Sequence, residues 1–379
     1  MAGIYIHIPF CKQKCYYCDF HFSISLKRKE EMLEALNKEF FLRKDELKQI
    51  TVETIYFGGG TPSILKIDEI EQLVSLVYKN FNVSKEVEIT LEANPDDLSQ
   101  SKIIALSKTK INRLSIGIQS FFDDDLQFMN RAHTAKESEK CLKTAMQYFD
   151  NITIDLIYGL PNMSNNKWLA NLKKAFELGV PHLSCYALTV EKKTALASFI
   201  KKGKVPPVDD EQAFGHFNIL VQETKKQGFE HYEISNFAKK GFYSKHNASY
   251  WQGKFYMGIG PSAHSFNGKE RSWNIANNAK YIKALSNNVL PQEVELLTEK
   301  ERFNEYVMTG LRTIWGVDLN TIASNFKPEY YNNLQQSAAL FITKGLLEIC
   351  LDEYNNSILK TTAKGKFLAD GIASELFII

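Results

Sequence analysis

Three cysteines in one short segment are the residues of this chain best suited to chemistry. Cys11, Cys15 and Cys18 follow the apolar run GIYIHI with the spacing C-x3-C-x2-C. Thiolates ligate iron–sulfur clusters, and a 4Fe–4S cluster held by three of them keeps one iron free for another ligand. The alternatives are a Cys3His zinc site with His7 or His21 as fourth ligand, or a chance group of inert thiols. Zinc knuckles usually come in two C-x2-C pairs, and no second pair is present here.

A glycine-rich turn closes the second apolar run of the chain. The sequence YFGGGTP places Gly59, Gly60 and Thr61 directly after residues 53–57. Because glycine has no Cβ, the backbone of such a turn can come close to a ligand. An ordinary strand-to-helix turn would have the same composition. The turn therefore indicates a ligand site only in combination with the cysteine segment, which follows the preceding strand.

Polar residues stand near the ends of the later apolar runs. These are Glu92 in LEANP, Gln119 in IGIQSF, Arg131 in NRAH and Asp155 in ITIDLIYGLP. In parallel barrels, active sites are built at the C-terminal ends of the strands. Only seven of the 46 basic residues are Arg, so Arg131 is best explained by its planar fork, which suits a carboxylate. Taken singly, each residue could instead be a helix cap or a surface ion pair.

One histidine stands in an aromatic segment, HNASYW, at residues 246–251. Neutral imidazole is a standard axial ligand of heme iron, and Tyr250 and Trp251 could pack against a porphyrin. A structural role within the aromatic segment is the alternative for His246. His264 in GPSAHSF is a second candidate ligand.

The first half of the chain alternates short β-branched runs with longer segments of helical period. The runs are apolar on both faces, which is typical of parallel strands covered by helices. Six such β-α units predict a partial (β/α)6 barrel of the TIM type, because a closed barrel needs eight. The strands are expected at 3–8, 53–57, 86–92, 113–119, 152–159 and 182–188, and helices at 26–48, 67–80, 135–148 and 165–178.

The pattern changes in the second half of the chain. A polar connection at 201–212 precedes a helix at about 210–227, and residues 229–275 are rich in aromatics and glycine with little periodicity. After Pro291 the helical pattern returns, with one helix expected within 296–313. We expect three parts: a partial barrel over 1–235, a segment packed on it over 236–291, and a small helical domain over 292–379.

Composition narrows the class of protein. The 379 residues carry a net charge of +2, which removes the basic face that a nucleic-acid binder needs. No apolar run approaches the roughly 18 residues of a membrane span, and the N-terminus MAGIYIHIPF lacks the pattern of a signal peptide. We therefore expect a cytoplasmic protein without a transmembrane segment. The remaining cysteines, Cys141, Cys185 and Cys350, are typical of core thiols.

The cysteine segment, the glycine turn and the β-α rhythm together resemble the radical S-adenosylmethionine (SAM) superfamily. The resemblance implies that Cys11, Cys15 and Cys18 hold a 4Fe–4S cluster whose open iron binds the amino and carboxylate groups of SAM. It also implies a set of SAM-contacting residues: Tyr5, Tyr17 beside the adenine, Gly59, Gly60, Thr61, Glu92, Gln119, Arg131 and Asp155. It assigns no catalytic side chain.

Longer phrases resemble the group of oxygen-independent coproporphyrinogen III oxidases. These include GIYIHIPFCKQKCYYCDF, NRLSIGIQSF and KHNASYWQGKFYMGIGPSAHSF, and the C-terminal part resembles that group's winged-helix-like end. The oxidases carry a further cysteine where this chain has Phe20, and a long extension before the first strand. Both departures point to the group's heme chaperone branch, whose H-N-x-x-Y-W signature implies that His246 ligates heme.

The expected function is therefore to bind heme and transfer it to an acceptor protein, for instance a respiratory one, on a radical SAM scaffold. Two alternatives stay open at this point. One is oxidase turnover, in which a SAM-derived radical starts decarboxylation of porphyrinogen propionates. The other is a radical SAM enzyme that does not handle heme. Whether the protein is an enzyme is left undecided by its sequence.

Overall fold

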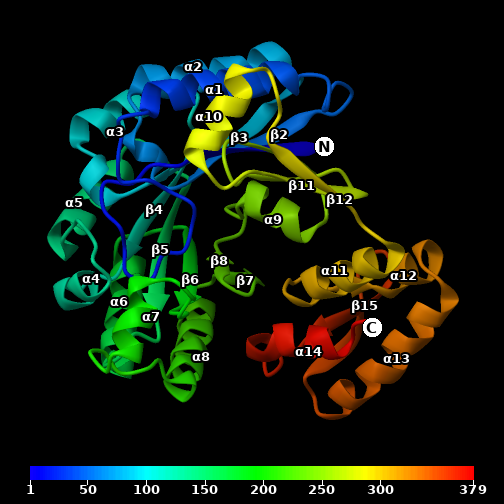
Figure 1. The fold of residues 1–379 in the computed structure, drawn as a ribbon. Coiled ribbons are helices and arrows are strands. Elements are labelled where there is room, and N and C mark those ends of the chain that lie inside the picture. The colour runs from blue at the N-terminus through cyan, green and yellow to red at the C-terminus, as the bar shows by residue number, and fades with distance from the viewer.

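The computed structural model describes residues 1–379, and its centre is one large twisted sheet (Figure 1). Six neighbouring strands of this sheet run parallel in chain order. They are β1 (Ala2–Ile8), β2 (Val52–Gly59), β3 (Val83–Ala93), β4 (Arg113–Gln119), β5 (Ile152–Tyr158) and β6 (His182–Ala187). Each coincides with an apolar run of the sequence, and the predicted α/β class with a parallel sheet is confirmed.

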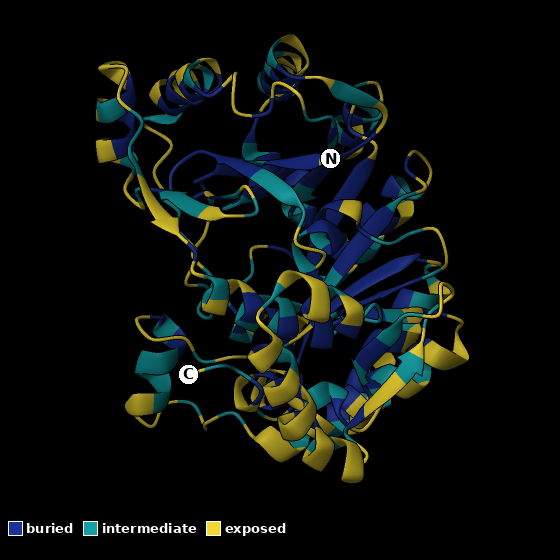
Figure 2. Cartoon of the chain, turned by 90° about the vertical axis from the view of Figure 1, so that its right-hand side faces the viewer, coloured by how far each residue is buried: buried dark blue, intermediate teal, exposed yellow.

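Helices cover the outer face of the parallel strands, with their apolar stripes turned inward. In α2, the buried residues Ile70, Leu73, Val74 and Val77 repeat with the helical period. Figure 2 shows buried strands behind helices whose outer faces are exposed. The helices of this part of the chain are α1 (Lys29–Leu42), α2 (Ile67–Asn80), α3 (Gln100–Leu106), α4 (Asp123–Phe128), α5 (Ala135–Ala145), α6 (Asn165–Glu177), α7 (Ala195–Lys201) and α8 (Asp210–Lys226), with short 3-10 turns η1 (Pro62–Ile64) and η2 (Pro95–Asp97).

The aperiodic segment after residue 229 extends the sheet at both edges. Next to β6 lie β8 (Asn236–Ala238) and β7 (Glu230–Glu233), both antiparallel. On the other side, β9 (Phe255–Ile259) pairs in parallel with β1, so a late strand borders the first one. Beyond it follow β10 (His264–Phe266), β11 (Glu270–Asn274) and β12 (Gln292–Leu296), while α9 (Lys245–Trp251) and α10 (Asn278–Ser286) lie between these strands in the chain.

The last part of the chain has a hydrophobic cluster of its own, formed by residues between Phe303 and Leu376. Four helices pack around a small antiparallel sheet of order β13-β15-β14. Their bounds are α11 (Glu299–Leu311), β13 (Val317–Asp318), α12 (Leu319–Asn325), α13 (Pro328–Thr343), β14 (Leu347–Leu351), β15 (Ser357–Thr361), η3 (Lys366–Leu368) and α14 (Ala369–Glu375). The strand that directly follows Pro291, β12, belongs to the large sheet instead. None of the helices combines the length and apolar character that crossing a membrane requires.

Candidate functional site

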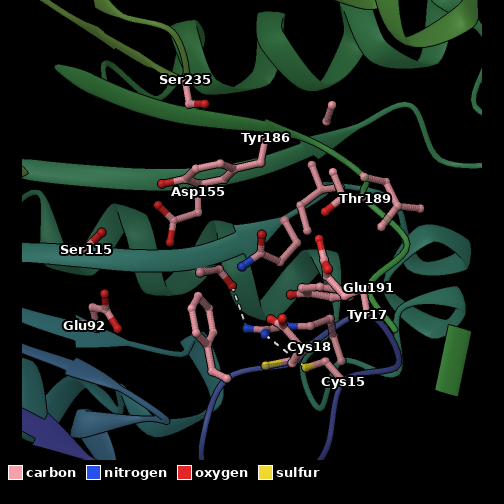
Figure 3. A pocket seen from close by; sticks show the side chains of 18 of the residues that line it. Cys15, Tyr17, Cys18, Glu92, Ser115, Asp155, Tyr186, Thr189, Glu191 and Ser235 are labelled. Carbon is pink, nitrogen blue, oxygen red and sulfur yellow. Dashed lines mark hydrogen bonds between the residues drawn. The ribbon is translucent and has the colours of Figure 1, made fainter. Parts of the chain in front are cut away.

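A cavity of about 650 Å³ opens at the C-terminal ends of the parallel strands. The cysteine loop after β1 forms one end of it, and side chains of β3, β5 and β6 form a wall (Figure 3). Parallel strands bring their C-terminal ends to one edge, which is why residues far apart in sequence meet here. Eleven of the thirteen residues assigned to the site from sequence line this cavity: Cys11, Cys15, Tyr17, Cys18, Gly59, Gly60, Thr61, Glu92, Gln119, Arg131 and Asp155.

The cysteine loop is tied to its surroundings at several points. Thr61 Oγ1 donates to Cys11 Sγ over 3.4 Å, and Arg131 Nη1 donates to Cys15 Sγ over the same distance. The loop's Lys12 forms ion pairs with Asp96 and Asp97 after β3. These contacts hold a segment without regular structure against the strand ends, with all three thiols half-buried.

The side chains of His7 and His21, the candidate fourth ligands of a Cys3His zinc site, are engaged in other contacts. His7 Nε2 lies 2.9 Å from the His21 carbonyl oxygen, and His7 Nδ1 lies 3.2 Å from the Tyr5 hydroxyl. The ring of His21 is itself bonded to Asn278 over 2.7 Å. The structure also has no group of three or more His, Cys, Asp or Glu side chains able to hold a single metal ion. Cysteine ligands of a four-iron cluster bind different irons, so they need not converge on one point.

The glycines of the turn after β2 are required by packing within the chain. A Cβ on Gly60 would lie 2.5 Å from the Phe10 carbonyl oxygen, and one on Gly59 would lie 2.5 Å from the His7 ring. Gly59 also has φ of +104°, which side chains rarely adopt. The turn therefore fits directly against the strand and loop that carry the cysteines. Sequence reasoning attributed these glycines to a close ligand, and the structure adds the cysteine loop as a second close neighbour.

Two carboxyl groups of the cavity wall, on strands β3 and β5, have a raised pKa. Burial raises the pKa of Glu92 to about 8, against the opposing effect of the Tyr56 hydroxyl, which donates to Glu92 Oε1 over 2.8 Å. Burial also raises the pKa of Asp155 to about 6, with the Arg113 charge acting in the opposite direction. Such groups gain when a ligand offers hydrogen-bond donors or a positive charge, because the ionised carboxylate is otherwise poorly solvated.

Two hydrogen bonds fix Arg131 in the cavity, in addition to the one that its Nη1 donates to Cys15 Sγ. Its Nη2 donates to Asn94 Oδ1 over 2.6 Å and to the Gly117 carbonyl over 2.9 Å, while its Nε is buried without a partner. Gln119 ends β4 with φ of +67°, a conformation that costs energy and is typical of functional sites. Asn94 and Gly117 also line the cavity and were missed from sequence, because neither stands in a distinctive motif.

His246 and Tyr5, both predicted as ligand contacts, lie outside this cavity. His246 is 1% exposed. Its Nδ1 lies 2.7 Å from Thr54 Oγ1, and its Nε2 lies 2.8 Å from the Tyr250 hydroxyl. Gly3 makes room for the ring, since a Cβ there would lie 3.1 Å from it. Both ring nitrogens of His246 are therefore engaged by hydroxyl groups in this conformation.

Burial also keeps the imidazole of His246 neutral. It lowers the pKa of His246 to about 3, and the positive charge of Arg113 acts in the same direction. The ring stacks on Tyr56 with centroids 4.9 Å apart. The runner-up His264 is exposed, on β10, and it too lies outside the cavity. Ligation of a group in the cavity by His246 would therefore require a rearrangement of α9.

The C-terminal part of the chain contributes to the same cavity, which the sequence analysis did not foresee. Arg312 after α11, Phe367 in η3 and Asp370 in α14 line it together with Phe217 of α8 and Tyr186 of β6. Arg312 could have been singled out from the sequence, as Arg131 was, because only seven of the 46 basic residues are Arg. Phe367 and Asp370 reach the cavity through the packing of the C-terminal part, and no local sequence pattern predicts their position.

Comparison with known proteins agrees with this architecture. The Radical SAM superfamily model matches residues 5–175. The chain is 33% identical over 376 residues to the heme chaperone HemW of Bacillus subtilis (strain 168), covering 98% of each chain. It is 30% identical over 380 residues to HemW of Mycobacterium tuberculosis (strain ATCC 25618 / H37Rv), covering 99% of this chain and 94% of that one.

Among solved structures, the coproporphyrinogen III oxidase HemN of Escherichia coli superposes with a TM-score of 0.85 at 24% sequence identity. The superposition covers 99% of this chain and 90% of that one. At this identity the likeness speaks for the fold alone. The fold includes the C-terminal helices and the small sheet, as well as the parallel strands.

Proposed function

Because the chain belongs to the HemW family of radical SAM proteins, we propose that it binds heme and transfers it to an acceptor protein. The observation that carries this proposal is the 33% identity to a heme chaperone over 98% of both chains. The likeness spans the barrel, the aromatic segment and the C-terminal part, so no part of the chain lacks a counterpart.

Cys11, Cys15 and Cys18 would hold a 4Fe–4S cluster at the end of β1. The donor set fits, since three half-buried thiols line one cavity and the neighbouring histidines are engaged elsewhere. When bound, such a cluster offers an iron with an open position for the amino and carboxylate groups of SAM. The chain's own part is to fix the loop through Thr61, Arg131 and the Lys12 ion pairs.

SAM would lie along the strand ends beside this loop. Arg131 would pair with its carboxylate through the guanidinium fork. The half-buried Glu92 and Asp155 would accept hydrogen bonds from the ammonium and hydroxyl groups, which relieves their poor solvation. Gln119, Gly59 and Gly60 complete the cavity on the same side, and Tyr17 lines it near the adenine position implied by the family.

Heme would use the apolar remainder of the cavity. Its walls there include Ile157, Tyr158, Leu188, Phe217 and Phe367, which suit the faces of a porphyrin. Axial ligation by His246 is retained as a proposal of lower rank, since Tyr250 would first have to release Nε2. The division of the chain into a barrel over 1–235, a segment over 236–291 and a C-terminal domain over 292–379 is likewise proposed, and the C-terminal domain contributes Arg312, Phe367 and Asp370 to this cavity.

The proposal is tested by titrating heme into anaerobically reconstituted protein while SAM cleavage is followed in parallel. We expect saturable heme binding with a defined Soret band and slow or absent SAM turnover. The oxidase alternative predicts SAM-dependent decarboxylation of coproporphyrinogen and little stable heme. Decarboxylation without heme binding would overturn the chaperone proposal, and absence of both would favour an enzyme with another substrate.

A further inference from the structure

Only two positive charges face the cavity, although the chain carries 46 basic residues. They are Arg131 near the cysteine loop and Arg312 at the C-terminal side, and no lysine lines it. Five acidic residues share the lining: Asp19, Glu92, Asp155, Glu191 and Asp370. A ligand with negative groups could therefore be accepted at two points only. With seven Arg among the 46 basic residues, an arginine at both points indicates that the fork matters.

Arg131 lies at the cysteine-loop end of the cavity, where the proposed function assigns it to the SAM carboxylate. Its Nη2 donates to Asn94 and to the Gly117 carbonyl and its Nη1 to Cys15 Sγ, while its buried Nε has no partner in the chain. The Arg131 guanidinium lies where the cysteine loop meets the strand ends. In the rest of the cavity, Arg312 is the basic side chain with which an anionic group can pair.

The guanidinium of Arg312 is oriented but incompletely bonded. Its Cζ lies 4.8 Å from the centroid of the Trp251 ring, on which it stacks. Nη2 lies 3.5 Å from Glu233 Oε1, and Nη1 pairs with Asp370. The Nε is buried and donates to nothing. A buried donor without a partner is unfavourable, so an acceptor placed there by a ligand would be bound strongly.

The two carboxylates around Arg312 differ in what they could do. Glu233 is 2% exposed and its other oxygen accepts from Asn236 Nδ2 over 2.6 Å, so it is part of the fixed frame. The side chain of Asp370 is 67% exposed and has no other partner among the hydrogen bonds of the chain. Solvent can take over Asp370 at little cost. Asp370 can therefore leave Arg312 when a better acceptor arrives.

Aromatic rings stand in the same part of the cavity. Phe367 lies three residues before Asp370, and its ring centroid is 5.2 Å from that of Phe217. Both line the cavity with Arg312. An apolar wall beside a forked cation suits a flat hydrophobic ligand that carries a carboxylate at its edge.

We infer that Arg312 binds a propionate of the heme, and that Asp370 holds the guanidinium in place until the propionate displaces it. This inference rests on the proposed function, because it needs a propionate-bearing tetrapyrrole as the ligand. It makes the C-terminal domain part of the heme site rather than a separate appendage. It also predicts that the site binds heme with free propionates more tightly than heme whose propionates are esterified.

The test compares heme with its dimethyl ester, in which both propionates are neutral, by Soret titration of the full-length reconstituted protein. We expect native protein to bind heme at least about tenfold more tightly than the ester. Arg312→Lys keeps the charge but loses the fork and the Nε donor, so this preference should fall to about twofold or less. Arg302→Lys is the matched control, since Arg302 is exposed on α11 and does not line the cavity.

Asp370→Asn provides a test with the opposite sign and little risk to the fold. Removing the competing charge should raise heme affinity about two- to fivefold and leave ester affinity unchanged. An unaltered heme-to-ester ratio in Arg312→Lys, or heme affinity that does not rise in Asp370→Asn, would overturn the inference while native protein still binds heme. Native protein that binds neither ligand would instead overturn the proposed function.

Discussion

Replacing His246 with alanine should lower the free energy of unfolding of the heme-free protein by at least about 4 kcal/mol. The imidazole is 1% exposed and bonded through both nitrogens, to Thr54 and Tyr250. Truncating a buried side chain of this size costs about 2–5 kcal/mol. Two hydroxyl groups left without a partner add about 1 kcal/mol each. Loss of heme binding in this variant would therefore not by itself identify an axial ligand.

The pH dependence of that difference gives a second, independent readout. Burial lowers the pKa of His246 from 6.5 to about 3 in the native state. Between these two values the unfolded chain binds a proton that the native chain does not, so the histidine's contribution to stability falls as the pH drops below 6.5. At about pH 5 this loss amounts to roughly 2 kcal/mol. The gap between native and variant should narrow by that amount.

Urea unfolding of reduced apoprotein, followed by tryptophan fluorescence at about pH 7.5 and about pH 5, measures both effects. His264→Ala is the matched control, because His264 is exposed and its side chain forms no hydrogen bond within the chain. A His246→Ala variant within about 1 kcal/mol of native protein at neutral pH would refute the buried network. A gap that widened at low pH would refute the neutral imidazole.

Three further outcomes follow from the cysteine loop and the strand ends. Cys15→Ala should abolish the brown cluster absorption and the roughly four irons per chain, whereas Cys141→Ala should keep both; stoichiometric zinc in native protein would contradict this. Gly60→Ala should reduce cluster yield after reconstitution, because its Cβ would lie 2.5 Å from the backbone before the loop, while Gly371→Ala meets nothing within 4 Å and should load iron normally. Arg131→Lys should weaken SAM binding about tenfold in equilibrium dialysis, and unchanged affinity would remove Arg131 from the SAM site.

Much of the fold could be predicted because its signals are local. Parallel strands covered on both faces are continuous apolar runs, and β4 was expected at 113–119 and found at Arg113–Gln119. The helix α2 was likewise expected at 67–80 and found at Ile67–Asn80. Parallel strands carry their C-terminal residues to one edge, so Glu92, Gln119 and Asp155 could be grouped without knowledge of the packing.

Tertiary structure alone decided what surrounds that group. The five-residue strand β9 has no periodic signal of its own, yet its parallel pairing with β1 and the packing of α9 beside it enclose His246. In the same way, Arg312 reaches the cavity only because the C-terminal part of the chain packs against the open side of the cavity. Both results depend on contacts between residues far apart in the chain, such as Thr54 with His246 and Glu233 with Arg312. The free energy of such contacts comes from surfaces that exist only after each part has folded, so no pattern within a short window of sequence records them.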